Sequence, residues 1–193
     1  MILPQIKDQH DYGYEVPPCS RKQLIDHAHS IHKAVGYTGE TAFPILELIE
    51  FVFPAVYDDF DFVILPEPEM GDDFGLTLPD EHVIKLREDV YEAAEAGQGF
   101  GRMVAAHESS HLLRHEKIPV SLARRKATKE IPSYRSSEWQ ANAMAGALLM
   151  PASKIVDMTV QEIIERYKVT PTAAETQLRK VREGARKWPI PKL

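Results

Sequence analysis

The sequence predicts an α+β domain in which a small antiparallel sheet packs on helices, with a helical appendage at the C-terminus. Three observations predict this fold class. Helical patterns without an internal proline fill 99–116 and 137–150, and runs rich in β-branched and aromatic residues are concentrated in 61–87. The chain has 193 residues, of which 44% are hydrophobic, and this is enough for one sizeable core.

The chain begins with a predicted arm and a predicted helix. Residues 1–19 are mostly polar and reach two prolines near their end, so we expect an arm without a fold of its own. Ser20 is suited to cap a helix that ends at the glycines further on. His29 and His32 lie on this helix without a third ligand nearby, and we expect them on a solvated face. Residues 20–151 are predicted to form the main domain.

Three short runs predict the sheet. The run 62–65 is stopped by a proline, and 75–78 and 82–87 flank a Pro-Asp turn, which predicts an antiparallel hairpin. The strand over 82–87 alternates in polarity, so we expect one side of it to stay open. An extended peptide can pair with such an edge through main-chain hydrogen bonds.

The stretch 99–116 carries the strongest chemical signal, the pattern HESSH, whose fixed positions are His107, Glu108 and His111. Residues four apart share one face of a helix, so the two histidines can offer two imidazoles to one ion. Glu108 lies about 100° further round the helix. It can therefore contact a bound water without binding the metal itself. The HExxH pattern is typical of zinc metallopeptidases.

A catalytic zinc site usually has three protein ligands and one open position. His115 lies about 12 Å along the helix from His107, too far for three ligands on one helix to converge. Cys19 sits in a proline-rich turn, and a lone cysteine in a reducing compartment is usually only a thiol. Glu138 is the best candidate for the third ligand.

Glu138 opens a second strong helix. Ser137 with Gln140 predicts a capping box, which places Glu138 in the first helical turn. Asn142, four residues after Glu138, shares its face and could orient a metal-bound histidine from behind.

The run HESSHLLRH followed by SSEWQANAMAGALLMP resembles the ImmA/IrrE-type zinc peptidases, over roughly 61–151. This resemblance implies a zincin-like metallopeptidase fold of the gluzincin-like type. It further implies that His107, His111 and Glu138 bind Zn²⁺ and that Glu108 is the catalytic carboxylate.

The resemblance also implies a substrate, because this family cleaves helix-turn-helix transcriptional repressors. The sequence departs from many members at Ser109 and Ser110, where they carry Leu-Gly. Both serines are small, so we expect the helix packing to survive, with a slight loss of helix propensity.

A second class of function stays open on the residues alone. In it the protein is a non-catalytic regulatory or partner-binding protein with a structural or vestigial zinc site. A structural site is closed by four protein ligands, and the sequence offers no persuasive fourth. Candidate oxyanion-stabilising residues also stay open, and they are Tyr91, Arg102, Tyr134 and Arg135.

The charge is unevenly distributed along the chain. The formal net charge is −6, which divides into −10 for residues 1–151 and +4 for residues 152–193. The body is therefore too acidic to bind DNA by itself, and the basic tail could contact DNA or an acidic partner.

The tail, 152–193, is predicted to form two helices. Thr159 with Glu162 predicts a capping box, and Thr170 is suited to cap the second helix. The pair could be a degenerate helix-turn-helix, a clamp on the body, or a surface that recognises a substrate's DNA-binding domain. We do not expect direct DNA binding, because two helices lack the third that supports such a motif.

One cysteine excludes a disulfide framework, and the N-terminus has no basic region followed by an apolar run. No stretch of 18 consecutive apolar residues occurs, so no membrane span is predicted. We expect a cytoplasmic protein.

Overall fold

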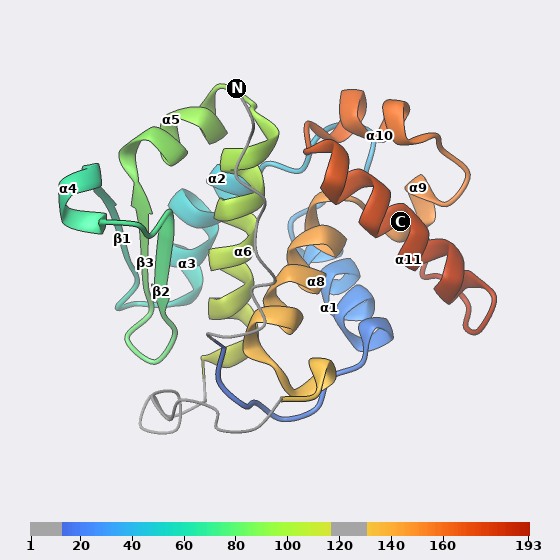
Figure 1. The fold of residues 1–193 in the computed structure, drawn as a ribbon, viewed down its shortest axis with the longest axis horizontal. Coiled ribbons are helices and arrows are strands. Elements are labelled where there is room, and N and C mark those ends of the chain that lie inside the picture. Colours follow the sequence, from blue (N-terminus) through green and yellow to red (C-terminus); the bar gives the residue numbers. More distant parts are fainter. Residues whose placement is uncertain (1–12, 117–130) are drawn as a thin grey trace.

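The computed structural model describes residues 13–116 and 131–193. Figure 1 shows a small sheet on one side, the long helix α6 in the middle, and α1, α8 and the C-terminal helices on the other side, which confirms the α+β class. The helical elements are α1 (Arg21–Ala34), α2 (Ile45–Glu47), the π-helical η1 (Leu48–Val52), α3 (Phe53–Val56), α4 (Glu67–Met70), α5 (Glu88–Glu95), α6 (Gly99–His115), the 3-10 helix η2 (Ser133–Arg135), α8 (Ser137–Leu149), α9 (Ala152–Ile155), α10 (Val160–Tyr167) and α11 (Pro171–Ala185). Within the described ranges, none of the helices has the length and apolar composition needed to cross a membrane.

The sheet has the strands β1 (Asp61–Leu65), β2 (Gly75–Leu78) and β3 (Val83–Arg87) in the order β1-β3-β2. β2 and β3 form the predicted antiparallel hairpin, but β1 pairs with β3 in parallel, so the sheet is mixed and not wholly antiparallel. After β1 the chain passes through α4 and forms β2 at the opposite edge of the sheet, and it then returns as β3 between the two. β3 takes the centre because its side chains Ile84 and Leu86 are fully buried.

This strand order places the open edges of the sheet at β1 and β2 and not at β3. β3 has a partner on both sides, so the expectation that 82–87 offers an open edge is wrong. In the described part of the chain, β2 pairs only with β3, and it also packs against α6. The edge that lies beside the central helix therefore belongs to β2.

Helix α6 approaches its neighbours closely because glycines stand where they meet. A Cβ atom on Gly101 would lie 2.5 Å from the backbone oxygen of Val90 and from the nitrogen of Ala94, both in α5. A Cβ on Gly99 would lie 2.5 Å from the carbonyl carbon of Val169, which precedes α11. Only glycine allows these backbone contacts, and they fix α6 between the sheet side and the C-terminal helices.

Helix α8 is capped one residue earlier than predicted. The hydroxyl of Ser136 accepts a hydrogen bond from the backbone N–H of Trp139 (3.3 Å), so the predicted capping box at Ser137 is wrong. Ser137 pairs instead with Tyr14. Its hydroxyl accepts from the backbone N–H of Tyr14, and its own N–H donates to the carbonyl of Tyr14, both at 3.1 Å.

The N-terminal segment 13–19 is part of the fold, so the expectation of an arm without structure is wrong for these residues. Glu15 forms an isolated antiparallel bridge with Ser136. Val16 and Cys19 are buried, and Cys19 belongs to the hydrophobic core. The earlier part of the predicted arm, residues 1–12, lies outside the described residues.

The C-terminal tail packs on the same core as the main domain. The predicted capping box of Thr159 and Glu162 is present at the start of α10. Tyr167 and Leu178 are buried members of the common hydrophobic core. The hydroxyl of Tyr167 also donates to the carbonyl of Gly39 at 3.0 Å. This packing supports the clamp interpretation of the two tail helices.

His32 joins α1 to the end of α8, so the expectation of a solvated face is wrong for this residue. Its side chain is buried, and Nε2 donates to the carbonyl of Leu148 at 2.8 Å. That carbonyl belongs to the last turn of α8, where backbone oxygens lack helical partners. Burial lowers the pKa of His32 to about 4.

We expect His32 to make the stability of the protein fall in mild acid. The unfolded state has an ordinary histidine pKa of about 6.5, so it binds a proton that the folded state resists. The contribution of His32 to the free energy of unfolding is fully present above about pH 6.5. It is lost as the pH falls toward 4, by up to about 1.4 kcal/mol per pH unit. Urea unfolding between pH 4 and 7, compared with His32→Gln, isolates this contribution. If the free energy of unfolding fell equally with pH in the wild type and in His32→Gln, this role of His32 would be contradicted.

Candidate metal centre

Two neighbouring helices bring three metal-ligand side chains together. Nε2 of His107 and Nε2 of His111, one turn apart on α6, are 3.0 Å apart. Glu138, in the first turn of α8, places one carboxylate oxygen 3.2 Å from the first nitrogen and the other 3.3 Å from the second. These are the three residues named from the sequence, and together they form the group in the described part of the chain that could hold a metal ion.

The separations of these atoms are close to those of ligands around a tetrahedral ion, with each nitrogen facing a different oxygen of Glu138. Corners of a tetrahedron that lie about 2.0 Å from its centre are about 3.3 Å from one another, and 2.0–2.2 Å is the usual distance from zinc to nitrogen and oxygen ligands. The three side chains would supply three ligands to such an ion and leave a fourth position for water. The Glu138 side chain keeps 35% of its surface exposed, whereas that of His111 keeps 10%, so the group is accessible from one side.

The charges in the group favour a cation. Burial would raise the pKa of Glu138, but hydrogen bonds with His107 and His111 outweigh it and hold the pKa well below its usual range. Burial would lower the pKa of His107, but Glu138 and Glu108 outweigh it and raise that pKa. The carboxylate is thus stabilised as an anion, and positive charge beside it is favoured.

Asn142 holds the first imidazole, as its place on the face of Glu138 predicted. Its side-chain oxygen lies 3.1 Å from Nδ1 of His107, which assigns the proton to Nδ1 and leaves Nε2 free to bind an ion. Figure 1 shows α6 and α8 running antiparallel beside each other, so Asn142, one turn after Glu138, lies beside His107, the earlier of the two histidines.

His115 lies behind the second imidazole and is not part of the metal-ligand group, in agreement with the argument from helix rise. Its Nδ1 is 3.2 Å from Nδ1 of His111. Burial lowers the pKa of His115 to about 3, so it is neutral at pH 7 and can accept the Nδ1 proton of His111. This contact orients the ring of His111.

Glu108 leans away from α6 toward β2. The residue is 7% exposed, and one of its carboxylate oxygens, Oε2, accepts a hydrogen bond of 2.6 Å from the hydroxyl of Thr77. Sequence reasoning missed this contact, because nothing in the pattern of a half-buried strand relates Thr77 to a helix residue 31 positions away.

Three of the four candidate oxyanion-stabilising residues are engaged elsewhere. The hydroxyl of Tyr91 donates to Glu50, and the guanidinium of Arg102 donates to the carbonyl of Phe43, each at 2.7 Å. Arg135 forms an ion pair with Glu15 at 2.7 Å. The fourth, Tyr134, is exposed.

Tyr14 is a further polar residue near the group that sequence reasoning missed, because it lies in the segment expected to be an arm. Its ring is 5.8 Å from that of His115. Burial and the nearby carboxylates of Glu138, Asp80 and Glu108 raise the pKa of Tyr14 to about 12. The phenol therefore keeps its proton at pH 7 and can donate it in a hydrogen bond.

A mixed helix-and-sheet domain with two histidines on a central helix and a carboxylate from the next helix defines the class of zincin-like metallopeptidase domains. The family described as Peptidase_M78, the IrrE N-terminal-like domain, matches residues 71–179, and the chain belongs to this family. The match confirms the family resemblance seen in the motifs. A search of curated proteins gives no match to this chain.

Proposed function

We propose that the protein is a zinc-dependent metalloendopeptidase. The observation that carries the proposal is the convergence of His107, His111 and Glu138, with facing atoms 3.0–3.3 Å apart. Glu108 directly follows His107 in the same helix. When bound there, Zn²⁺ would supply a Lewis acid that polarises the peptide carbonyl and makes water a stronger nucleophile.

The protein's own residues account for the proton movements. The carboxylate of Glu108 takes a proton from the attacking water and returns it to the nitrogen of the leaving amine. Asn142 and His115 keep the two imidazoles in the orientation and tautomer that bind an ion. Tyr14, whose ring lies 5.8 Å from that of His115 and whose phenol keeps its proton at pH 7, is our candidate donor to the oxygen that gains negative charge.

We propose that the substrate is a helix-turn-helix repressor, and two features support this. The family resemblance is one. The other is the acidic lobe, which we define as residues 58–81. Between Lys33 and Lys85 the sequence has twelve Asp and Glu residues and no Lys or Arg. All nine that belong to the lobe are exposed. A DNA-binding protein carries a basic surface that complements such a lobe.

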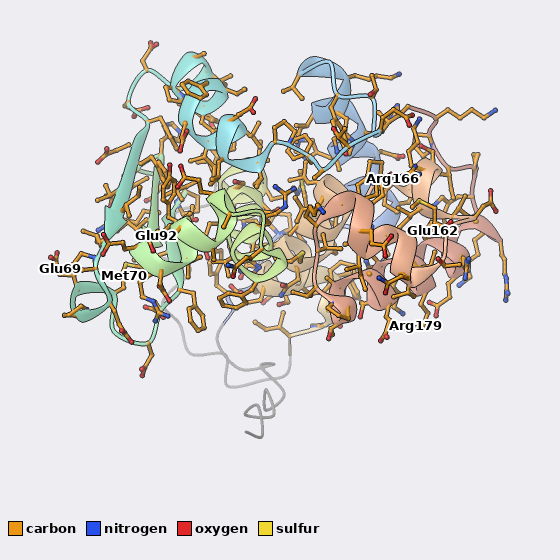
Figure 2. The ribbon with its side chains drawn as sticks, turned by 90° about the horizontal axis from the view of Figure 1, so that it is seen from above. Glu69, Met70, Glu92, Glu162, Arg166 and Arg179 are labelled. Carbon is orange, nitrogen blue, oxygen red and sulfur yellow. The ribbon has the colours of Figure 1, made fainter. Side chains whose placement is uncertain are left out.

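The acidic lobe and the basic tail lie at opposite ends of the molecule. Figure 2 shows Glu69 of the lobe at one end and Arg166 and Arg179 of the tail helices at the other. The lobe contains β2, whose outer edge lies beside α6. We propose that the scissile segment pairs with this edge as an added strand.

The alternative of a structural zinc site has less support. A structural site needs a fourth protein ligand, and the group found among the described residues has three. We therefore favour the enzyme over a non-catalytic regulatory protein.

We expect Glu138→Ala to lose most of the zinc affinity. The substitution removes one of three ligands, so the loss should exceed the ten- to hundredfold that removing a neighbour of a ligand typically causes. Titration calorimetry and metal analysis measure it. Glu175→Ala, a change at an exposed glutamate of α11, serves as the matched control. Unchanged zinc stoichiometry and affinity in Glu138→Ala would remove this residue from the site.

Glu108→Gln should bind zinc normally and lose cleavage by about a hundred- to ten-thousandfold in kcat, because the amide cannot accept the proton. Cleavage of purified repressors, with and without a chelator, measures the effect. Glu92→Gln, a change at an exposed glutamate of α5, is the control. Wild-type rates in Glu108→Gln would exclude the proposed role.

We expect the acidic lobe to lower KM for a repressor through long-range attraction. Asp72→Lys combined with Asp73→Lys should raise KM by about tenfold at low salt and less at 0.5 M, where charges are screened beyond about 4 Å. A short uncharged peptide should show no such change. The control Arg179→Glu reverses a charge on the tail. If salt changed KM equally for the repressor and for the uncharged peptide, the acidic lobe would have no role in attracting the substrate.

A further inference from the structure

The catalytic carboxylate is held by the sheet as well as by its own helix. The hydroxyl of Thr77 lies 2.6 Å from Oε2 of Glu108 and 3.0 Å from the backbone oxygen of the same residue. A hydroxyl has one proton to donate. The shorter contact lies in the range of hydrogen bonds from a hydroxyl to a carboxylate, so we assign the proton to Oε2.

The neighbouring residue Gly75 makes room for this arrangement. A Cβ atom there would lie 2.7 Å from Cγ of Glu108 and 3.0 Å from both Cδ and Oε1. Side chains at 75 and 77 point to the same face of a strand. β2 therefore offers Glu108 a surface with one hydrogen-bond donor and no obstructing side chain.

We propose that Thr77 is the positioning residue of Glu108, a role that rests on the proposed peptidase function. Its hydroxyl donates a hydrogen bond to Oε2 and so fixes the rotamer of the Glu108 side chain. The absence of a side chain at Gly75 leaves space for the carboxylate. The other oxygen, Oε1, then exchanges the proton with water and the leaving amine. Because β2 also carries the open edge, the strand that positions Glu108 is the strand on which the substrate is aligned.

The test compares Thr77→Val, which keeps the shape and removes the hydroxyl, with Thr77→Ser, which keeps the hydroxyl. We expect kcat to fall about ten- to a hundredfold in Thr77→Val and to return to within about threefold of wild type in Thr77→Ser. KM and zinc stoichiometry should stay unchanged, because both substitutions leave the backbone of β2 available to pair with the substrate, and Thr77 is not one of the three candidate metal ligands. Thr172→Val, at an exposed threonine of α11, controls for the substitution itself.

Crystal structures of the metal-free variants give a readout that does not depend on activity. Glu108 should keep its rotamer in wild type and Thr77→Ser and turn away from β2 in both Thr77→Val and Gly75→Ala. An unmoved carboxylate in Thr77→Val overturns the proposal. So does an equal fall of kcat in Thr77→Val and Thr77→Ser, or a change confined to KM. If the wild type cleaves no repressor or peptide, the peptidase function fails, while the metal-free structures still decide the role of Thr77.

Discussion

The close antiparallel packing of α6 and α8 is the constraint on which the rest of the structure depends. Side-chain atoms of α6 and α8 lie 3.2–3.3 Å apart at the candidate metal centre, which requires the helices themselves to lie in direct contact. Ala141 and Ala145, which are buried on the Glu138 face of α8, are small enough to permit this approach. Gly101 brings α5 equally close from the other side. The metal-ligand group is therefore a consequence of core packing, and a bulky substitution in that core would act on the group without touching it.

Each side chain of the candidate site is contacted by a different part of the chain. Asn142 of α8 supports His107, His115 of α6 lies behind His111, and Thr77 of β2 contacts Glu108. The N-terminal segment adds Tyr14, tied by its backbone to the start of α8. Orientation by such neighbours would limit the rearrangement that binding of an ion requires, because the rotamers are already set.

The distribution of charge suggests how a partner approaches. The acidic lobe carries nine exposed carboxylates beside the open edge of β2, while the basic residues of α11 lie at the other end of the molecule (Figure 2). The field of such a molecule attracts a basic partner toward the sheet end and not toward the tail. The tail packs on the common core through Tyr167 and Leu178.

The sequence by itself determined the local part of the site. Helical periodicity places His107 and His111 on one face, and it places Asn142 on the face of Glu138, because residues four apart align in any α-helix. Only the tertiary structure decided which strand lies at the edge, that Thr77 and Gly75 face Glu108, that Tyr14 pairs with Ser137, and that His32 is buried. These contacts join segments far apart in the chain, and they follow from how all the apolar surfaces are buried together, which no local pattern encodes.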